Sequence, residues 1–333
     1  MTVRLWRAFL LLIVAVSILI LVRALRRPEG WRTPAPVRAG AALEPDVSPE
    51  GVAPDGRLEG NGAERYARAL EVYEARRLPL RAQRRANRLP TEPRIGGEEL
   101  GALIEGGKFR DTDLYDAGPR PAAFNVFPSG ARWEFRRALD PMEMRPYMAA
   151  VVVLSQVALG EGMRRYRASR WGDAERIYVA VARFGRALRR RPGAFVDLQM
   201  GIEIELNAVH YLEVLARQTH SPGMESAAIR YGAAIRRLDL AVRARFASLS
   251  LPGPAIELLQ HAAEPVWRVQ AASALVQYLW LGRATGTESI AIRRAMQAAR
   301  SDPSPWVRDA VARAMAAPES DYVDLTEDAP PAR

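Results

Sequence analysis

Apolar residues recur at helical spacing through most of this chain, from about residue 63 to residue 317. Side chains three and four positions apart share one face of an α-helix, whereas a strand requires alternation. The clearest stripes are Ile177, Val181, Phe184 and Leu188; Phe195, Leu198, Ile202, Leu206 and Val209; and Ala228, Tyr231, Ile235, Leu238, Val242 and Phe246. Alternation over residues 202–206 lies within a longer helical stripe. We therefore expect an all-α fold.

Proline and capping residues mark where several helices begin. The sequence Asp140-Pro141-Met142-Glu143 resembles a capping box with proline at the first helical position. Ser221-Pro222 and Ser304-Pro305 offer the same order of a capping residue and then proline. Residues 107–140 lack this period and are expected to be irregular.

Residues 8–22 form an uncharged apolar run, AFLLLIVAVSILILV, with arginines on both sides. The run alone is shorter than the roughly 20 residues that cross a bilayer core. Apolar residues at 5–6 and 24–25 lengthen it, and Arg7 and Arg23 can extend to the headgroups. We therefore expect a single transmembrane helix that anchors the protein in the cell membrane.

A cleaved secretory signal is the competing interpretation of this run. Cleavage would need small residues in an A-x-A-like pattern after it, and the sequence there, VRALRRPEGWR, is bulky and charged. A retained anchor is therefore favoured. Its orientation stays open, because the arginines after the run favour a cytoplasmic body while moving a charged N-terminus outward is the rarer event.

Composition divides the chain into five parts. The anchor and its basic flanks occupy residues 1–27, and residues 28–62, rich in proline, glycine and alanine, predict a flexible linker. Residues 63–262 form the predicted helical domain. Residues 263–317 hold two repeats, and residues 318–333 form an acidic tail that is expected to be disordered.

Overall composition restricts the chemistry that the chain can perform. At 333 residues and 49% hydrophobic content, the body is large and apolar enough to bury a core. The absence of cysteine excludes disulfides, thiolate catalysis and cysteine-ligated zinc. The net charge of +10 is carried almost entirely by arginine, with Lys108 as the only lysine.

An arginine cluster occupies residues 161–191 and holds only three acidic residues. Its candidates for a partner or anionic surface are Arg164, Arg165, Arg167, Arg186, Arg189, Arg190 and Arg191. Such a cluster suits anionic lipid, nucleic acid or an acidic protein. The simpler interpretation, a solvated face of amphipathic helices, is favoured. Nucleic acid is the least favoured partner, because no recognition motif accompanies the charge.

Two C-terminal segments align at a spacing of 40 residues: WRVQAASAL at 267–275 and VRDAVARAM at 307–315. The pairs that define the repeat are Trp267 with Val307, Arg268 with Arg308, and Leu275 with Met315. A proline-containing turn precedes each segment, and a helix is expected between them at 288–299.

These segments resemble the HEAT-repeat family, whose second helices often read V-R-x-A-A-x-x-A-L after a D-P-like turn. The resemblance covers residues 264–316, and the period falls in the range of HEAT units. It implies stacked helix pairs of an α-solenoid, in which small alanines allow close stacking. Gln270 departs from the small residue expected at its position. Two units are fewer than the three usually needed, so they would cap a longer helical stack.

A weaker similarity lies upstream, over residues 180–192. Ala180, Phe184, Ala187 and Pro192 have the spacing of the second helix of a tetratricopeptide repeat. The helix before them lacks that family's W-x-x-L-G-x-x-Y pattern. Both similarities imply stacked helix pairs.

One helix face carries the best candidates for metal binding or acid–base chemistry. Glu203, Asn207 and His210 follow one another at i, i+4 and i+7. A carboxylate and an imidazole on a shared face suit either role. Because no second helix supplies a matching pair, a polar surface patch is the preferred interpretation. No catalytic motif is present, and no cofactor or small-molecule substrate is indicated.

These features predict a single-pass membrane protein whose helical-repeat body acts as a scaffold for an unidentified protein partner. Two other classes stay open. One is a helical-bundle enzyme or metal-binding protein that uses Glu203 and His210. The other is a basic surface over 161–191 that engages anionic lipid or nucleic acid.

Overall fold

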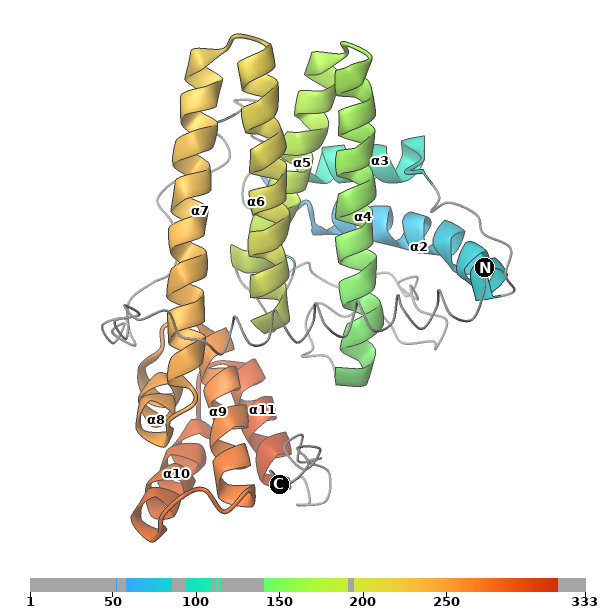
Figure 1. The fold of residues 1–333 in the computed structure, drawn as a ribbon. Coiled ribbons are helices and arrows are strands. Elements are labelled where there is room, and N and C mark those ends of the chain that lie inside the picture. The colour runs from blue at the N-terminus through green and yellow to red at the C-terminus, as the bar shows by residue number, and fades with distance from the viewer. Residues whose placement is uncertain are drawn as a thin grey trace, which may run out of the picture. The chain divides into compact units, whose positions relative to one another are not determined.

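The computed structural model describes residues 52, 58–85, 94–109, 112, 114, 141–190 and 195–316. Over these residues the protein is all-α, as the apolar stripes predict (Figure 1). The helices are α2 (Ala63–Arg85), α3 (Gly97–Gly106), α4 (Pro141–Arg167), α5 (Trp171–Arg190), α6 (Phe195–Gln218), α7 (Pro222–Ser248), α8 (Pro252–His261), α9 (Pro265–Trp280), α10 (Gly286–Ala299) and α11 (Pro305–Ala316). In the described part of the chain, extended pairing is confined to one bridge between Leu58 and Phe109.

Proline determines the first turn of several helices. α4, α7 and α11 each begin at the proline that the sequence predicts. Ser221 precedes α7, but its side chain makes no capping hydrogen bond. The start of α7 therefore follows from the fixed φ of Pro222 and its missing N–H rather than from a polar cap.

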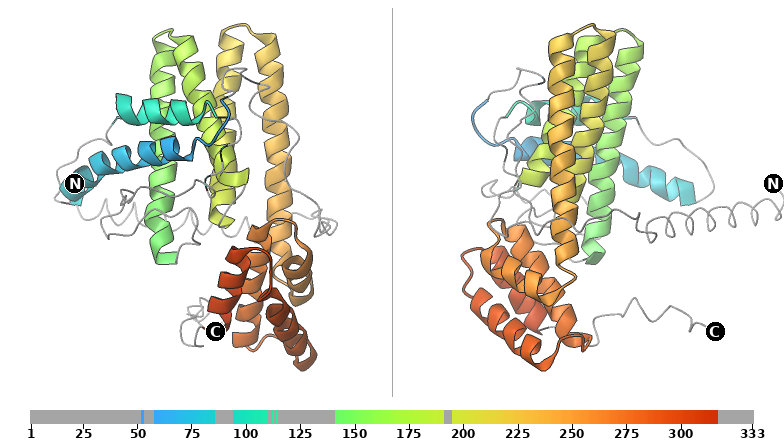
Figure 2. Two further views of the ribbon diagram at one scale, coloured as in Figure 1. Left: turned by 180° about the vertical axis from the view of Figure 1, so that it is seen from behind. Right: turned by 60° about the vertical axis from the view of Figure 1, so that its left-hand side comes forward.

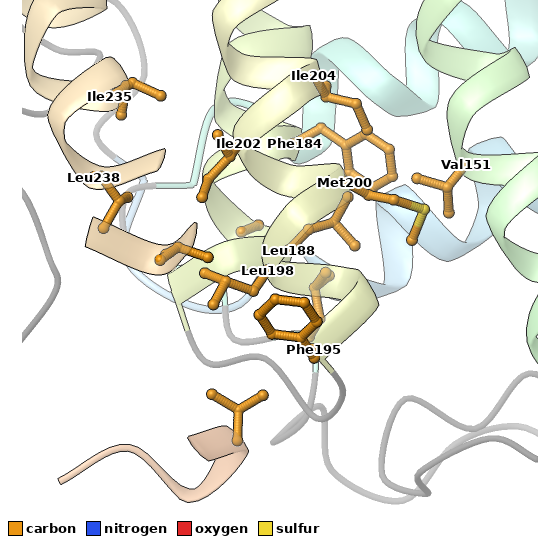
Figure 3. Packing of buried hydrophobic residues seen from close by; sticks show 14 of the residues in the cluster. Val151, Phe184, Leu188, Phe195, Leu198, Met200, Ile202, Ile204, Ile235 and Leu238 are labelled. Atoms are coloured by element: carbon orange, nitrogen blue, oxygen red, sulfur yellow. The ribbon is translucent and has the colours of Figure 1, made fainter. Parts of the chain in front are cut away.

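Helices α4 to α7 form a run in which each helix packs on the next one (Figure 1). Their connections are only a few residues long, which favours antiparallel neighbours. Buried side chains from all four helices meet between them, including Val151, Phe184, Leu188, Phe195, Leu198, Met200, Ile202, Ile204, Ile235 and Leu238 (Figure 3). These residues include members of all three predicted apolar stripes, so the stripes are the core faces of α5, α6 and α7.

The closest helix contact in this run is the crossing of α5 and α6. A Cβ atom added at Gly185 would lie 2.7 Å from the Gly201 carbonyl oxygen and 2.8 Å from the Glu205 backbone nitrogen. A Cβ atom added at Gly201 would lie 2.5 Å from the Gly185 carbonyl oxygen. These atoms belong to backbone that cannot move aside, so the two helices approach at a distance that only glycine permits.

Helices α2 and α3 lie side by side, across α4 and α5 (Figure 2). Tyr66 of α2 is buried and its ring centroid lies 4.9 Å from that of Phe184 on α5. Burial raises the pKa of the Tyr66 hydroxyl, an effect that nearby Arg183 partly opposes. Glu99 of α3 is also buried and pairs with Arg76 of α2. A buried aromatic contact and an ion pair therefore hold this pair of helices to the run and to each other.

Helices α8 to α11 form two stacked helix pairs. α8 packs on α9 and α10 contacts α11, while α8 also packs on α10 and α9 on α11. The predicted helix at 288–299 corresponds to α10, which begins at a capping box formed by Thr285 and Glu288. The backbone N–H of Thr285 donates a hydrogen bond to the Glu288 carboxylate at 2.8 Å, and this bond lowers the pKa of Glu288. The layers α8/α10 and α9/α11 are compatible with a helical solenoid.

Several predicted parts lie outside the described residues. These are the apolar run at 8–22, nearly all of the linker at 28–62, most of the irregular segment at 107–140, and the acidic tail. In the part of the chain that the structure describes, no helix combines the length and the apolar character that crossing a membrane requires.

The glycine crossing predicts an unequal response to alanine on α5. Gly185→Ala would force two backbones apart and should lower the free energy of unfolding by about 1–3 kcal/mol, as overpacked cores do. Gly172→Ala is the matched control, because a Cβ atom there meets nothing within 4 Å. It should leave stability unchanged or raise it by up to about 1 kcal/mol, since alanine favours the helix. Denaturant unfolding of both variants tests this expectation, which equal losses would contradict.

Candidate functional site

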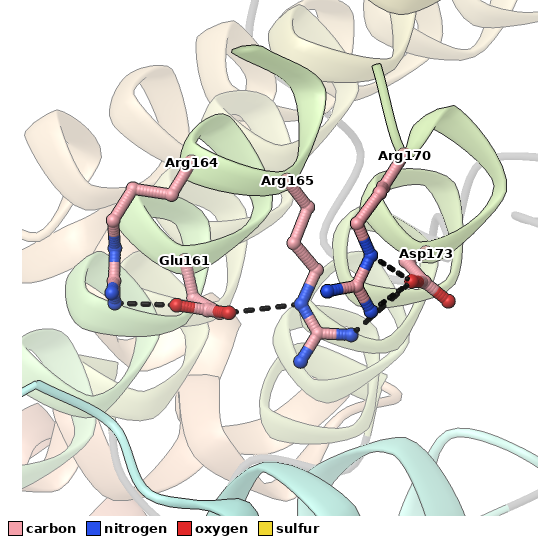
Figure 4. A network of polar contacts seen from close by, with 5 residues as sticks. All are labelled: Glu161, Arg164, Arg165, Arg170 and Asp173. Carbon is pink, nitrogen blue, oxygen red and sulfur yellow. Dashed lines mark hydrogen bonds and ion pairs between the residues drawn. The ribbon is translucent and has the colours of Figure 1, made fainter. Parts of the chain in front are cut away.

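The arginine cluster over 161–191 separates into three environments. Arg164 and Arg165 form ion pairs with Glu161 at the end of α4 (Figure 4). Arg165 also lies 3.7 Å from Asp173 of α5, whose second partner is Arg170. The hydrogen bond from Arg170 lowers the pKa of the Asp173 carboxyl. The side chains of these pairs are exposed or half-buried, and ion pairs close to the surface are screened by salt and contribute little to stability.

Arg189 has the opposite environment, since it is buried between α5 and α6. Its guanidinium forms a bidentate ion pair with Glu205, in which Nη2 donates to Oε1 at 3.1 Å and Nε donates to Oε2. Both side chains are almost completely inaccessible to solvent. The pair lies one turn from the Gly185–Gly201 crossing, and a Cβ atom at Gly201 would meet the Arg189 backbone at 2.8 Å. Arg189 is therefore an internal structural residue and is not part of a partner surface.

A third group of arginines faces α2 and the segment after α3. Arg186 and Arg190 line a small pocket with Arg183, Tyr66 and Thr112. Arg183, which was not among the predicted surface residues, donates a hydrogen bond to the Gly107 carbonyl oxygen at 2.6 Å. The space is about 20 Å³, which holds about one water molecule. These side chains therefore join two layers of helices rather than enclose a ligand.

Two predicted surface arginines remain. Arg167 is exposed at the end of α4, and Arg191 lies outside the described residues. The seven residues thus do not form one continuous basic surface over their described part. What remains of the predicted surface is the exposed end of α4 with its ion pairs.

The predicted polar face of α6 is exposed. Glu203, Asn207 and His210 all lie on the solvent side of the helix, with the His210 ring 5.9 Å from the Tyr211 ring. Among the described residues, no three histidine, aspartate or glutamate side chains are grouped so that they could hold a metal ion. In the described part of the chain, no third metal ligand therefore lies beside Glu203 and His210.

The two repeats make equivalent contacts at their arginines. Arg268 Nη1 donates to the carbonyl oxygens of Ala262 and Ala263, six and five residues earlier, at 2.5 and 3.0 Å. Arg308 Nη1 donates to those of Asp302 and Pro303, again six and five residues earlier, at 2.6 and 3.0 Å. The same side chain therefore closes the same turn in each unit, which gives the alignment of 267–275 with 307–315 a structural basis.

An additional ion pair joins the two units. Asp302 lies in the turn before α11, and its carboxylate accepts a hydrogen bond from Arg268 Nη2 at 3.1 Å. The same carboxylate accepts from the Ser304 backbone N–H at 2.8 Å. Asp302 therefore shapes its own turn and holds the preceding repeat. The first unit has Ala262 at the equivalent position and lacks this acid.

The other residues that define the repeat differ in how far their side chains are buried. Trp267, Leu275 and Val307 are fully buried, whereas Met315 is exposed at the end of α11. Trp267 lies beneath the Arg245 guanidinium, at 5.4 Å, and its ring centroid is 5.4 Å from that of Phe195. Burial lowers the pKa of Arg245, which pairs with Glu264 at 3.2 Å. Trp267 thus connects the repeats to α6 and α7.

An open groove lies beside this connection, between the end of α7 and one face of α9. Its volume is about 330 Å³. The lining residues are uncharged: Phe246, Ala247, Leu249, Ser250, Gln270, Ser273, Ala274 and Gln277. Phe246 stacks on Phe195 at 4.5 Å and yet keeps 46% of its surface exposed. The groove therefore combines a fixed aromatic ring with two carboxamides.

Sequence reasoning did not identify this groove, although one signal pointed to it. Gln270 is the residue that departs from the HEAT-like pattern, and it lines the groove. Gln270, Ser273, Ala274 and Gln277 share one face of α9. Phe246 belongs to an apolar stripe, and that pattern alone does not indicate that its side chain is exposed. Only the placement of α7 beside α9 turns these residues into one site.

No known protein family, curated protein or solved structure matches this chain significantly. The candidate site therefore rests on its own geometry.

The buried ion pair predicts that two glutamates of α6 contribute very differently to the free energy of unfolding. Glu205→Gln would leave the Arg189 charge buried without its counter-charge and should lower the free energy of unfolding by about 3–5 kcal/mol. Glu213→Gln, on the same helix, breaks a pair with the exposed Arg217 and should change little. Chemical denaturation compares the two variants, and similar losses would show that the Arg189–Glu205 pair is not a determinant of stability.

The repeat contacts predict that Arg268 matters more than Arg308. Arg268→Met removes the hydrogen bonds to the preceding turn and the ion pair with Asp302. It should lower the free energy of unfolding by about 1.5–3 kcal/mol. Arg308→Met removes only the bonds to the turn and should cost less. Thermal unfolding of both variants measures the order. If Arg308→Met proved equally or more damaging, the proposed role of Asp302 in joining the units would be wrong.

Proposed function

We propose that this protein is a membrane-anchored helical-repeat scaffold that binds an extended segment of a partner protein in the groove between α7 and α9. The observation that carries the proposal is the groove itself, open and uncharged, at the edge of two stacked helix pairs. Stacked helix pairs provide long surfaces for extended partners and need no catalytic groups.

The groove lining suits a peptide backbone. Gln270 and Gln277 lie two turns apart on α9, a separation of about 10 Å along the helix. An extended chain advances about 3.3 Å per residue, so about three of its residues match this separation. Each carboxamide offers one acceptor and two donors, which complement the N–H and C=O groups of a peptide.

The aromatic wall adds a site for one apolar side chain of that peptide. Phe246 is held in place by Phe195, which itself contacts Trp267. A ring that is already fixed loses little conformational entropy when a partner binds. Because the lining carries no charge, we expect binding to be driven by apolar contact and hydrogen bonds, with little dependence on salt.

Membrane anchoring is the second part of the proposal, and it rests on the sequence. The apolar run at 8–22 lacks a cleavage pattern and is followed by the proline- and glycine-rich residues 28–62. A scaffold tethered in this way would hold its partner close to the bilayer. The assignment of the repeats to a HEAT-like family belongs to the same proposal and rests on the residues at 264–316.

Site-specific photocrosslinking in living cells tests partner binding. A photoreactive residue in place of Gln277, within the groove, should give a discrete adduct with one protein. The matched control places the same residue at Ile290 of α10, which is exposed but outside the groove. It should give no such adduct.

A second variant separates groove binding from general adhesion. Ala274→Trp would fill the groove and should abolish the adduct at position 277 while the protein stays folded and in the membrane fraction. Equal adducts at 277 and 290, or an adduct that survives Ala274→Trp, would contradict the proposal.

A further inference from the structure

Helix α7 is the last member of the run α4–α7, and one of its faces is solvent-exposed. Its buried face packs on α6 and includes Ala228, Tyr231, Ile235, Leu238 and Val242. The opposite face begins near Ser226 and continues along the helix to Ala247. We call this opposite face the outer face of α7.

Two large aliphatic side chains are exposed on the outer face. Leu240 keeps 67% of its surface accessible, the highest value among the large hydrophobic residues of the described chain, and Ile229 keeps 43%. They are eleven residues apart, which is close to three helical turns, so they project in the same direction. Ala233 lies between them on the same side.

Arginines surround these aliphatic side chains. Arg230, Arg236 and Arg237 are exposed, and none of the three has a hydrogen-bond or ion-pair partner among the residues that the structure describes. This differs from Arg164, Arg165, Arg189 and Arg268, each of which has an acidic partner.

The acidic groups near the outer face lie around a fourth arginine. Arg243 pairs with Asp239 at 2.9 Å and also experiences the charge of Glu203 on α6. At the N-terminal end of α7, Glu225 pairs with Arg217. The positive charges of Arg230, Arg236 and Arg237 are therefore not neutralised by these acids.

We propose that the outer face of α7 docks onto an anionic lipid surface. Leu240 and Ile229 would enter the boundary between headgroups and acyl chains, while the arginines extend to the lipid phosphates. Exposed aliphatic side chains add nothing to contact with a phosphate backbone in water, which favours lipid over nucleic acid. The proposal rests on the proposed anchoring, since the anchor is what would bring α7 close to a bilayer.

The lipid composition sets the strength of this contact. A Lys or Arg close to an anionic membrane gives about a fivefold gain in binding, so three of them give on the order of 100-fold. A neutral membrane lacks this electrostatic attraction, so α7 should bind to it much more weakly.

The natural absence of cysteine allows a direct test on the full chain. Leu240→Cys provides one site for an environment-sensitive fluorophore. Ile290→Cys provides the control, an aliphatic residue on α10 that is similarly exposed. Each labelled chain is reconstituted through its own anchor into vesicles of phosphatidylcholine, with or without phosphatidylserine, that contain a quencher attached to the lipid chains.

We expect strong quenching of the label at 240 in the vesicles that contain phosphatidylserine, and little at 290. Quenching at 240 should fall in phosphatidylcholine alone and in high salt. It should also fall when Arg230→Gln, Arg236→Gln and Arg237→Gln are combined, although the anchor keeps that variant in the vesicles. Circular dichroism and thermal unfolding confirm that the variants share the parent fold.

Any of three quenching results would overturn the proposal: no quenching of the label at 240, equal quenching at 240 and 290, or quenching at 240 that is the same in neutral vesicles. A response of the label to RNA or to an acidic protein in place of lipid would also overturn it. Flotation of the vesicles shows whether the docking of α7 or the membrane anchoring has failed. If the chain floats and 240 is not quenched, only the docking of α7 is wrong, whereas a chain that does not float contradicts the anchor and the docking together.

Discussion

The crossing of α5 and α6 is the constraint on which the rest of the fold depends. Gly185 and Gly201 bring the two backbones into contact, and this closeness brings Arg189 within reach of Glu205. The desolvation that the pair suffers is compensated only while that geometry holds. Since α4 and α3 pack on α5, and α7 packs on α6, the helices of this part of the protein are assembled around this one contact.

The sequence is sufficient to predict the helices, but it does not predict which helices contact one another. Stripes such as Ile177 to Leu188 report which face of a helix is buried, and these faces lie in the core except at Phe246, which is exposed near the end of α7. Periodicity does not report which helix covers that face. Glu203 and Glu205 illustrate the difference, because both lie in one short alternating segment and yet point to nearly opposite sides of the helix, about 160° apart. The sequence drew attention to Glu203, which is exposed, whereas Glu205 holds the buried charge.

The arginines show the same distinction between composition and position. Arg186, Arg189 and Arg190 are close neighbours in the sequence, and nothing in their spacing marks Arg189 as the buried residue that pairs with Glu205. Conversely, α7 lies outside the predicted cluster and carries three exposed arginines that lack a partner in the described structure. Net charge therefore locates neither the internal ion pair nor the free surface charge, because both depend on what each helix packs against.

The contacts of Asp302 have a mechanical consequence. One carboxylate holds its own turn through Ser304 and the preceding unit through Arg268, whose guanidinium in turn holds the carbonyl groups of residues 262 and 263. A force applied to α11 would pass along this chain of bonds to the loop before α9. The two units would then resist tension as one stiff element instead of yielding one after the other.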